Sequence, residues 1–280
     1  MGLRAIILGC GSSGGVPRVG GDWGVCDPAE PKNARTRSSL LIQKWEGNTD
    51  GEPDPKACTN ILIDTSPDLR VQLLREKIGH LDAVFYTHDH ADQSHGIDDL
   101  RAIAYRMRAR IPTYMDAHTK IDLMTRFRYC FEMPEGRVHP PILDLQELLT
   151  DGQVTTIEGP GGAVSLETVE VSHGPTPSLG FLIDGKIAYI PDVWDISDEV
   201  LGRLHKIDCL IVDALRYTPH PTHAHADKTL SWLAQSQVQS AVLTNLHIDM
   251  DYATLCAELP SMITAAFDGM QINAYNAYNA

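Results

Sequence analysis

The amino-acid sequence predicts an α/β fold, in which a core of two sheet layers is covered on the outside by helices. Two observations lead to this prediction. Strand-like apolar runs alternate with segments of helical periodicity, and the order of strands first, then strand–helix alternation, occurs twice along the chain. No linker-like segment separates the two halves, and 280 residues suffice for one large domain. We therefore expect a single domain over residues 1–280.

The first half of the chain is predicted to begin with strands at residues 3–8, 38–43 and 60–66, of which the last two pair with each other. Ser66-Pro67-Asp68 has the composition of a helix start, because proline is favoured in the first helical turn. The elements that follow are, in order, a helix at 67–77, a buried strand at 82–87, a helix at 96–110, a short strand at 112–116 and a helix at 118–130.

A glycine-rich segment follows the first predicted strand. Gly9, Gly11 and Gly14 match the GxGxxG spacing of dinucleotide-binding folds, which place a helix directly after the glycines. Here the next residues, 15–21, contain Pro17 and further glycines and show no helical periodicity. We therefore reject dinucleotide binding and expect a tightly curled loop.

The second half of the chain repeats the order of the first. Residues 163–174 alternate apolar and polar side chains, as a half-buried strand does, and residues 180–192 indicate a hairpin that turns at Asp184-Gly185. The remaining predicted elements are a helix at 197–207, a strand at 208–215, a helix at 227–236, a strand at 240–246 and a helix at 251–260.

Composition and charge argue against several classes of protein. Apolar residues make up 43% of the chain and charged residues 21%, as in ordinary globular proteins. A formal charge of −14 argues against bulk nucleic-acid binding, which requires a basic face. No apolar run is long enough to span a bilayer, and the N-terminal run is too short for a secretion signal. The six widely spaced cysteines indicate reduced thiols, so we expect a cytoplasmic protein.

Histidine and aspartate side chains follow the ends of several predicted strands. The segment YTHDHADQSHGIDD at 86–99 comes directly after one strand and carries His-x-His, a spacing that lets two imidazoles face one metal ion. Taken singly, a histidine after a strand is more often a solvated loop residue. Strand ends at one edge of a sheet converge, however, so together these residues predict a metal site: His88, His90, Asp92, His173, Asp192 and His247.

The same stretches resemble the metallo-β-lactamase-fold hydrolases. The similarity rests on HDHAD at 88–92, SHG at 172–174, IPD at 190–192 and TNLH at 244–247. Within that family the chain is most similar to the cyclic-phosphate phosphodiesterases of the carbon–phosphorus lyase pathway, through the stretches LGCGSSGGVP, RSSLLI, NILIDTSPDLR, HGIDDLR and HADKTL. The resemblance covers nearly the whole chain and implies a four-layer αββα sandwich.

The resemblance also implies the ligands of two divalent metal ions. His88, His90 and His173 would hold the first ion, Asp92 would serve the second, and Asp192 would bridge them. Two such ions activate a water as hydroxide for in-line attack on phosphorus. Asp92 would also orient that hydroxide, so it is predicted to be catalytic as well as metal-binding.

A second catalytic residue is implied at His225, which corresponds to a histidine that contacts the substrate and protonates the leaving group. The alternative is a surface histidine at the start of a helix. His220 and His223, nearby in the chain, are weaker candidates. Arg35 and Arg37 have side chains that could anchor a phosphate, but we expect them to be surface arginines.

The sequence departs from the family pattern around the second ion. Gln93 and Asn245 stand where the family has histidines, and in each case a histidine lies two residues further on, at His95 and His247. Either a displaced histidine takes over, with His247 the stronger candidate, or the second position is built from oxygen donors. Oxygen ligands favour Mn²⁺ or Mg²⁺, whereas imidazole suits Zn²⁺. We expect two ions, Zn²⁺ or Mn²⁺, with a weaker second position. No structural zinc is expected, because only Cys26 remains of the N-terminal cluster that holds one in the phosphodiesterases.

Three hypotheses of function follow. The first is a metal-dependent phosphodiesterase acting on a small nucleotide or cyclic phosphate through a metal-bound hydroxide. The second is a hydrolase of a thioester or lactone on the same scaffold. The third is a nucleotide-binding protein whose second metal position has been lost. This hypothesis rests on Gln93 and Asn245, which stand where the family has histidines. The expected partner is a small phosphorylated molecule, and a homodimer is the most common closed assembly for such a chain.

Overall fold

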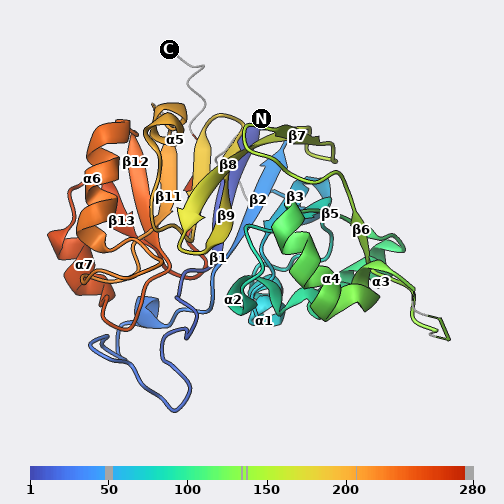
Figure 1. Ribbon diagram of the computed structural model, residues 1–280, viewed down its shortest axis with the longest axis horizontal. Coiled ribbons are helices and arrows are strands. Elements are labelled where there is room, and N and C mark those ends of the chain that lie inside the picture. The colour runs from blue at the N-terminus through green and yellow to red at the C-terminus, as the bar shows by residue number, and fades with distance from the viewer. Residues whose placement is uncertain (48–52, 134, 137, 206, 275–280) are drawn as a thin grey trace.

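A computed structural model describes residues 1–47, 53–133, 135–136, 138–205 and 207–274 (Figure 1). Within them the chain forms two seven-stranded β-sheets. The strand order of the first sheet is β14 (Gln271–Asn273), β1 (Gly2–Gly9), β2 (Ser39–Trp45), β3 (Thr59–Ile63), β4 (Ala83–Phe85), β5 (Ile111–Tyr114) and β6 (Leu143–Leu145). The order of the second is β13 (Ile263–Ala265), β12 (Ser240–Thr244), β11 (Cys209–Asp213), β10 (Ile187–Ile190), β9 (Thr176–Ile183), β8 (Val164–His173) and β7 (Val154–Ile157).

Helices cover the outer face of each sheet. The first sheet carries α1 (Leu69–Arg75), α3 (Leu100–Met107) and α4 (Ala117–Phe131), and the second carries α5 (Asp198–Arg203), α6 (Ala226–Ser236) and α7 (Tyr252–Glu258). The short α2 (Ala91–Ser94) follows β4, and 3-10 turns lie at Pro31–Asn33, Pro55–Ala57 and Ile97–Asp99. Figure 1 shows the strands between the two groups of helices. The four-layer αββα sandwich implied by the resemblance is therefore confirmed.

Strand β1 illustrates how one strand serves two layers of the core. Leu3, Ala5 and Ile7 lie between the two sheets, whereas Ile6 and Leu8 lie between the first sheet and its helices. All five side chains are buried. A strand that is buried on both faces has a continuous apolar run instead of an alternating pattern. Residues 5–8 form such a run, which is why this segment predicts a strand without a period of two.

The central strands of both sheets run parallel, so the strands of each set end at one edge. β3, β4 and β5 pair in parallel in the first sheet, and β10, β11 and β12 do so in the second. A hydrogen bond joins the two sets at this edge, because Gln93 Nε2, in α2, donates to Asp192 Oδ2, just after β10, at 3.0 Å. The edge therefore collects the side chains that follow strands of both sheets.

The main helices and strands lie close to their predicted positions. The 180–192 hairpin is confirmed, because β9 and β10 pair antiparallel and Asp184 and Gly185 have φ of 48° and 65°, as a type I′ turn requires. β6, β7, β13 and β14 were not predicted, because they are the short edge strands of the two sheets, are only partly buried and lack the apolar run of the central strands. In the described part of the chain, no helix has the length and apolar character needed to cross a bilayer.

Two predictions about the N-terminal loops have different outcomes. The Gly9–Gly14 segment leads into a loop and not a helix, as expected, and Gly11 forms bridges to Arg37 and Leu246. The interpretation of Arg35 as a surface residue is wrong. Its side chain is only 2% exposed, and the guanidinium lies 3.2 Å from Asn33 Oδ1 and 3.9 Å from the Cys26 sulfur. Arg35 is therefore part of the packing beneath this loop.

Candidate metal centre

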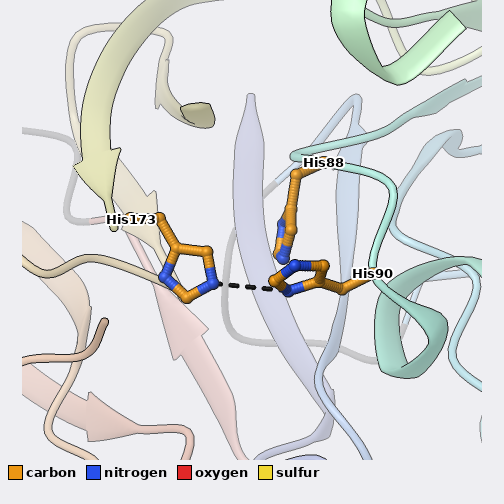
Figure 2. A group of neighbouring side chains, drawn as sticks. All are labelled: His88, His90 and His173. Atoms are coloured by element: carbon orange, nitrogen blue, oxygen red, sulfur yellow. Dashed lines mark hydrogen bonds between the residues drawn. The ribbon is translucent and has the colours of Figure 1, made fainter. Parts of the chain in front are cut away.

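Three histidines from the two sheets point toward one another at the shared edge (Figure 2). His88 and His90 follow β4, and His173 is the last residue of β8. One ring nitrogen of each lies within 4.8 Å of those of the other two. The ring centroids are 4.5, 5.0 and 5.1 Å apart. The structure thus brings together the three residues predicted to hold the first ion.

Hydrogen bonds determine which nitrogen of His88 is free. Thr87 Oγ1 donates to Asp64 Oδ2 at 2.8 Å and lies 2.9 Å from His88 Nδ1. Because the threonine proton is used on the carboxylate, His88 Nδ1 is the donor in the second contact, and Nε2 keeps its lone pair. His88 Nε2 is buried and has no hydrogen-bond partner in the described part of the chain. A buried lone pair of this kind fits a metal ligand.

His173 is oriented in the same way by a backbone carbonyl. Its Nδ1 lies 2.7 Å from the carbonyl oxygen of Thr222, so Nδ1 carries the hydrogen and Nε2 keeps the lone pair. That Nε2 lies 3.4 Å from His90 Nδ1, the contact drawn as a dashed line in Figure 2. Metal-binding histidines almost always donate their other N–H to such an acceptor. The three imidazoles therefore fit one divalent ion.

Burial keeps these imidazoles in the form that binds metal. Burial and the neighbouring rings of His90 and His173 lower the pKa of His88 well below its usual value. Burial, together with His223 and His90, lowers the pKa of His173 to about 3. Since neutral imidazole is the ligand form, these two nitrogens are available at neutral pH.

The low pKa of His173 leads to an expected pH dependence of stability in the metal-free protein. A histidine whose pKa falls on folding binds more protons in the unfolded chain, so stability is lost as the pH falls below the unfolded value of about 6.5. Between pH 6.5 and pH 5, His173 should lower the free energy of unfolding by about 2 kcal/mol. Urea unfolding of metal-free wild type and His173→Gln across this range measures the effect, and parallel pH curves would contradict it.

Replacing Thr87 by valine should weaken metal binding without removing a ligand. The substitution keeps the shape of the side chain but removes the hydroxyl that links Asp64 to His88. Loss of such an outer partner lowers metal affinity by roughly 10- to 100-fold. Competition with a chelating dye measures this affinity. Thr125→Val is a matched control, because the exposed Thr125 hydroxyl bonds the Ile121 carbonyl within its own helix, α4. Equal affinities for the two variants would argue against the role given to Thr87.

A second group of potential ligands adjoins the first. His173, Asp192 and His223 each have one atom that could bind a metal, and these three atoms lie within 4.8 Å of one another. Asp192 is 1% exposed, and its carboxylate accepts hydrogen bonds from Gln93 Nε2 at 3.0 Å and from Asn245 Nδ2 at 3.3 Å. Burial raises the pKa of Asp192 well above its usual range. A cation beside this carboxylate would offset the cost of burying its charge.

His223 enters this group from the loop between β11 and α6. Its Nδ1 lies 2.7 Å from Asp213 Oδ2 and 3.8 Å from Asp192 Oδ1. Burial alone would lower the pKa of His223, but the hydrogen bond to Asp213 and the nearby carboxylates raise it to about 9. The sequence analysis ranked His223 below His225. Asp213 lies at the end of a strand, as the other candidates do, and this position is the signal in the sequence that could have indicated His223 as its hydrogen-bond partner.

The two residues predicted to be catalytic each lie two residues along the chain from a member of these groups, Asp92 after His90 and His225 after His223. Asp92 is half-buried in α2, and its charge contributes to raising the pKa of Asp192. His225 is the N-cap residue of α6, and its side chain is partly exposed. Its imidazole forms no hydrogen bond or ion pair within the described residues. Both side chains are thus free to meet a ligand.

The two displaced histidines have other contacts. His247 Nε2 accepts a hydrogen bond from Arg18, and His247 Nδ1 lies 3.0 Å from Asp249 Oδ2. His95 is exposed, and its ring packs against Phe127 at a centroid distance of 5.5 Å. Neither belongs to any of the three groups of potential metal ligands found among the described residues, the third of which is Asp89, His118 and Asp122. The structure therefore does not bring His247, predicted as a ligand of the second ion, into the metal centre.

Comparisons with known proteins agree with this architecture. The family model described as a beta-lactamase superfamily domain matches residues 59–248. Coenzyme PQQ synthesis protein B of Rhodopseudomonas palustris is 32% identical over 235 residues, which cover 75% of this chain and 73% of that protein. A protein named octanoyltransferase, from Porphyromonas gingivalis, is 32% identical over 278 residues, which cover 96% of this chain and 51% of that one. The chain thus spans about half the length of this relative.

Solved structures show the same fold. A crystal structure described as a new diphosphatase from the PhnP family has 31% sequence identity and a TM-score of 0.83, and the match covers 98% of this chain and 97% of that chain. Zinc-bound PqqB from Methylobacterium extorquens has 18% identity and a TM-score of 0.66, over 96% of this chain and 99% of that chain. The latter match supports the fold alone.

A four-layer αββα sandwich with a histidine-rich centre at the edge of its two sheets defines the class of metallo-β-lactamase-fold hydrolases. The family model and the similar proteins place the chain within it: this protein belongs to the beta-lactamase superfamily. The resemblance read from the sequence is confirmed at this level.

Proposed function

We propose that the protein is a metal-dependent phosphodiesterase, which hydrolyses a phosphate ester or diphosphate linkage in a small molecule such as a nucleotide or cyclic phosphate. The observation that carries the proposal is the convergence of His88, His90 and His173 beside the buried carboxylate of Asp192. The similar structure described as a diphosphatase, at 31% identity over 98% of the chain, supports a phosphorylated substrate.

The chain's own groups would position the substrate and the protons. Divalent ions held by the histidines and Asp192 would supply Lewis acidity and an activated water for attack on phosphorus. Asp92, half-buried next to Asp192, can accept a hydrogen bond from the attacking water and fix its direction. His225, whose imidazole has no hydrogen bond or ion pair with the residues that the structure describes, can donate a proton to the leaving oxygen.

Two arginines beside His247 also suit an anionic substrate. The chain carries a net charge of −14, yet Arg18 and Arg216 both lie close to His247, two residues beyond Asn245. Within the described residues, neither guanidinium has an ion pair with a carboxylate; Arg18 bonds His247, and Arg216 bonds the carbonyls of residues 218 and 219. Guanidinium groups bind phosphate oxygens with two parallel hydrogen bonds. This pair therefore favours a phosphorylated substrate over a neutral one.

Hydrolysis of bis(4-nitrophenyl) phosphate by Mn²⁺- or Zn²⁺-loaded protein tests the proposed function. A panel of cyclic phosphates and nucleoside diphosphate derivatives then narrows the substrate, and His90→Ala serves as the inactive control. One relative is named octanoyltransferase, and an acyl substrate is the alternative hypothesis. The panel therefore includes an octanoyl thioester and a lactone. Turnover confined to the thioester or the lactone would overturn the proposal.

The role of His225 can be measured through the leaving group. A general acid contributes roughly 10²- to 10⁴-fold when it protonates a poor leaving group, whereas 4-nitrophenolate departs without a proton. We therefore expect His225→Gln to lose about 10²-fold or more on an alkyl phosphodiester but only a small factor on the nitrophenyl ester. Equal losses on both substrates would instead indicate a structural role at the start of α6.

A further inference from the structure

Beside Asp192, the side-chain amides of Gln93 and Asn245 stand where the family pattern has imidazoles. Gln93 and Asn245 each donate an amide hydrogen bond to its carboxylate. An amide nitrogen carries no lone pair for a metal, whereas its oxygen is a suitable ligand for a hard cation. Gln93 Oε1 is buried and has no hydrogen-bond partner within the described residues. Gln93 Oε1 is therefore available to a cation beside Asp192, whereas positions 93 and 245 supply no imidazole.

His223 supplies an imidazole at this place from another segment of the chain. Its ring lies 4.6 Å from that of His173, between centroids. His223 Nδ1 lies 3.8 Å from Asp192 Oδ1, and Nε2 has no hydrogen bond or ion pair within the described residues. His223 Nδ1 is 3.2 Å from Asn245 Nδ2. The ring thus lies directly beside the residue that replaces a histidine of the family pattern.

A buried carboxylate orients the His223 ring. Asp213 is fully buried, and its Oδ2 lies 2.7 Å from His223 Nδ1. Asp213 is itself held by the backbone N–H of Val193 at 3.1 Å and by Asn245 Nδ2 at 3.3 Å. A carboxylate on one ring nitrogen is the usual outer partner of a metal-binding histidine, because it fixes the tautomer and leaves the other nitrogen for the ion.

The backbone around His223 is also fixed. The next residue, Ala224, is fully buried, and its N–H donates to the Val193 carbonyl at 2.6 Å. Ala226 N–H donates to the Arg216 carbonyl at 2.9 Å, which closes the base of the loop. His223 therefore comes from a loop whose backbone is bonded to Val193 and closed at its base by the bond between Ala226 and Arg216.

We propose that His223 and Asp192 hold a second divalent ion, with Gln93 Oε1 and Asp92 as further oxygen donors. The inference rests on the proposed function, because it extends the same metal centre. The first position offers three imidazoles and suits Zn²⁺, whereas the second is rich in oxygen and favours Mn²⁺ or Mg²⁺. His247 is not needed as a ligand, since its Nε2 is already bonded to Arg18.

Metal content distinguishes this proposal from its alternatives. Protein loaded with Mn²⁺ and dialysed is analysed by mass spectrometry as wild type, His223→Gln and, as a matched control, His220→Gln. His220 lies in the same loop, 5.1 Å from His223 between ring centroids, but belongs to neither ligand group. We expect two equivalents in the wild type and in His220→Gln, and one in His223→Gln. Electron paramagnetic resonance should show coupled Mn²⁺ in the first two proteins and isolated Mn²⁺ in the third.

Three results would contradict the proposal, and they distinguish the role of His223 from the proposed hydrolase function. Two equivalents in His223→Gln would overturn the role of His223 and leave the hydrolase proposal intact. A single equivalent in the wild type would also overturn it and would mean that a protonated His223 stands in place of a second ion. No bound metal in any protein would overturn the metal-dependent hydrolase itself. Circular dichroism and a second variant, His223→Asn, exclude loss of fold as the cause of a lower count.

Discussion

Replacing His173 by alanine should remove the first metal ion and lower phosphodiester hydrolysis on the order of a thousandfold or more. His173 belongs to both ligand groups, so its loss affects both positions at once. A bound divalent ion contributes several kcal/mol to the transition state, and each 1.4 kcal/mol or so corresponds to a factor of ten in rate. The measurements are kcat/KM with bis(4-nitrophenyl) phosphate and metal content on the same samples.

A histidine outside the centre provides the control for this experiment. His205 is exposed and contacts only the Ser236 carbonyl, at 3.2 Å, in the described structure. His205→Ala should keep both the metal content and the rate of the wild type. Full activity of His173→Ala after dialysis would show that the three-histidine group is not the catalytic centre.

Asp192→Asn should have opposite effects on activity and on stability. The substitution keeps the shape of the side chain but removes the buried charge next to the ions, so we expect a rate loss of about 10²-fold or more. In the metal-free protein the same charge is unfavourable, because burial raises the pKa of Asp192 far above that of an exposed aspartate. A carboxylate whose pKa rises on folding lowers stability increasingly above its unfolded pKa.

The metal-free Asp192→Asn protein should therefore be more stable than the metal-free wild type at neutral pH. Thermal unfolding with a chelator present measures this difference, and the difference should shrink as the pH falls toward 4. After metal loading the order should reverse, because only the wild type gains full stability from the ion. A variant that is less stable under every condition would indicate that Asp192 serves packing and not metal binding.

The sequence predicted much of the fold and the three histidines that converge at the candidate centre, because both depend on local signals. Continuous apolar runs and turn residues such as Asp184-Gly185 report directly on strands and hairpins. His88 and His90 share one short segment after a strand, and His173 obeys the same strand-end rule. Short edge strands such as β6 and β14 gave no period to recognise.

The second ligand group could not be predicted in the same way, because it depends on contacts between distant segments. His223 and Asp213 are ten residues apart, and only the path of the loop between them shows that they bond. Likewise, His247 stands at a favourable position in the sequence, but Arg18, from the far N-terminal loop, occupies its free nitrogen. Such pairings are fixed by tertiary packing, which a single sequence does not display.

The division of the candidate ligands between the two halves of the molecule has a mechanical consequence. His88 and His90 follow a strand of the first sheet, whereas His173 ends one strand of the second sheet and Asp192 follows another, so an ion bound by them would be a removable cross-link between the halves. The halves cannot separate without breaking coordination bonds, and metal would therefore slow their opening much more than local fraying at the termini. Hydrogen exchange should show this as metal-dependent protection of β4 and β8 together, although they lie in different sheets.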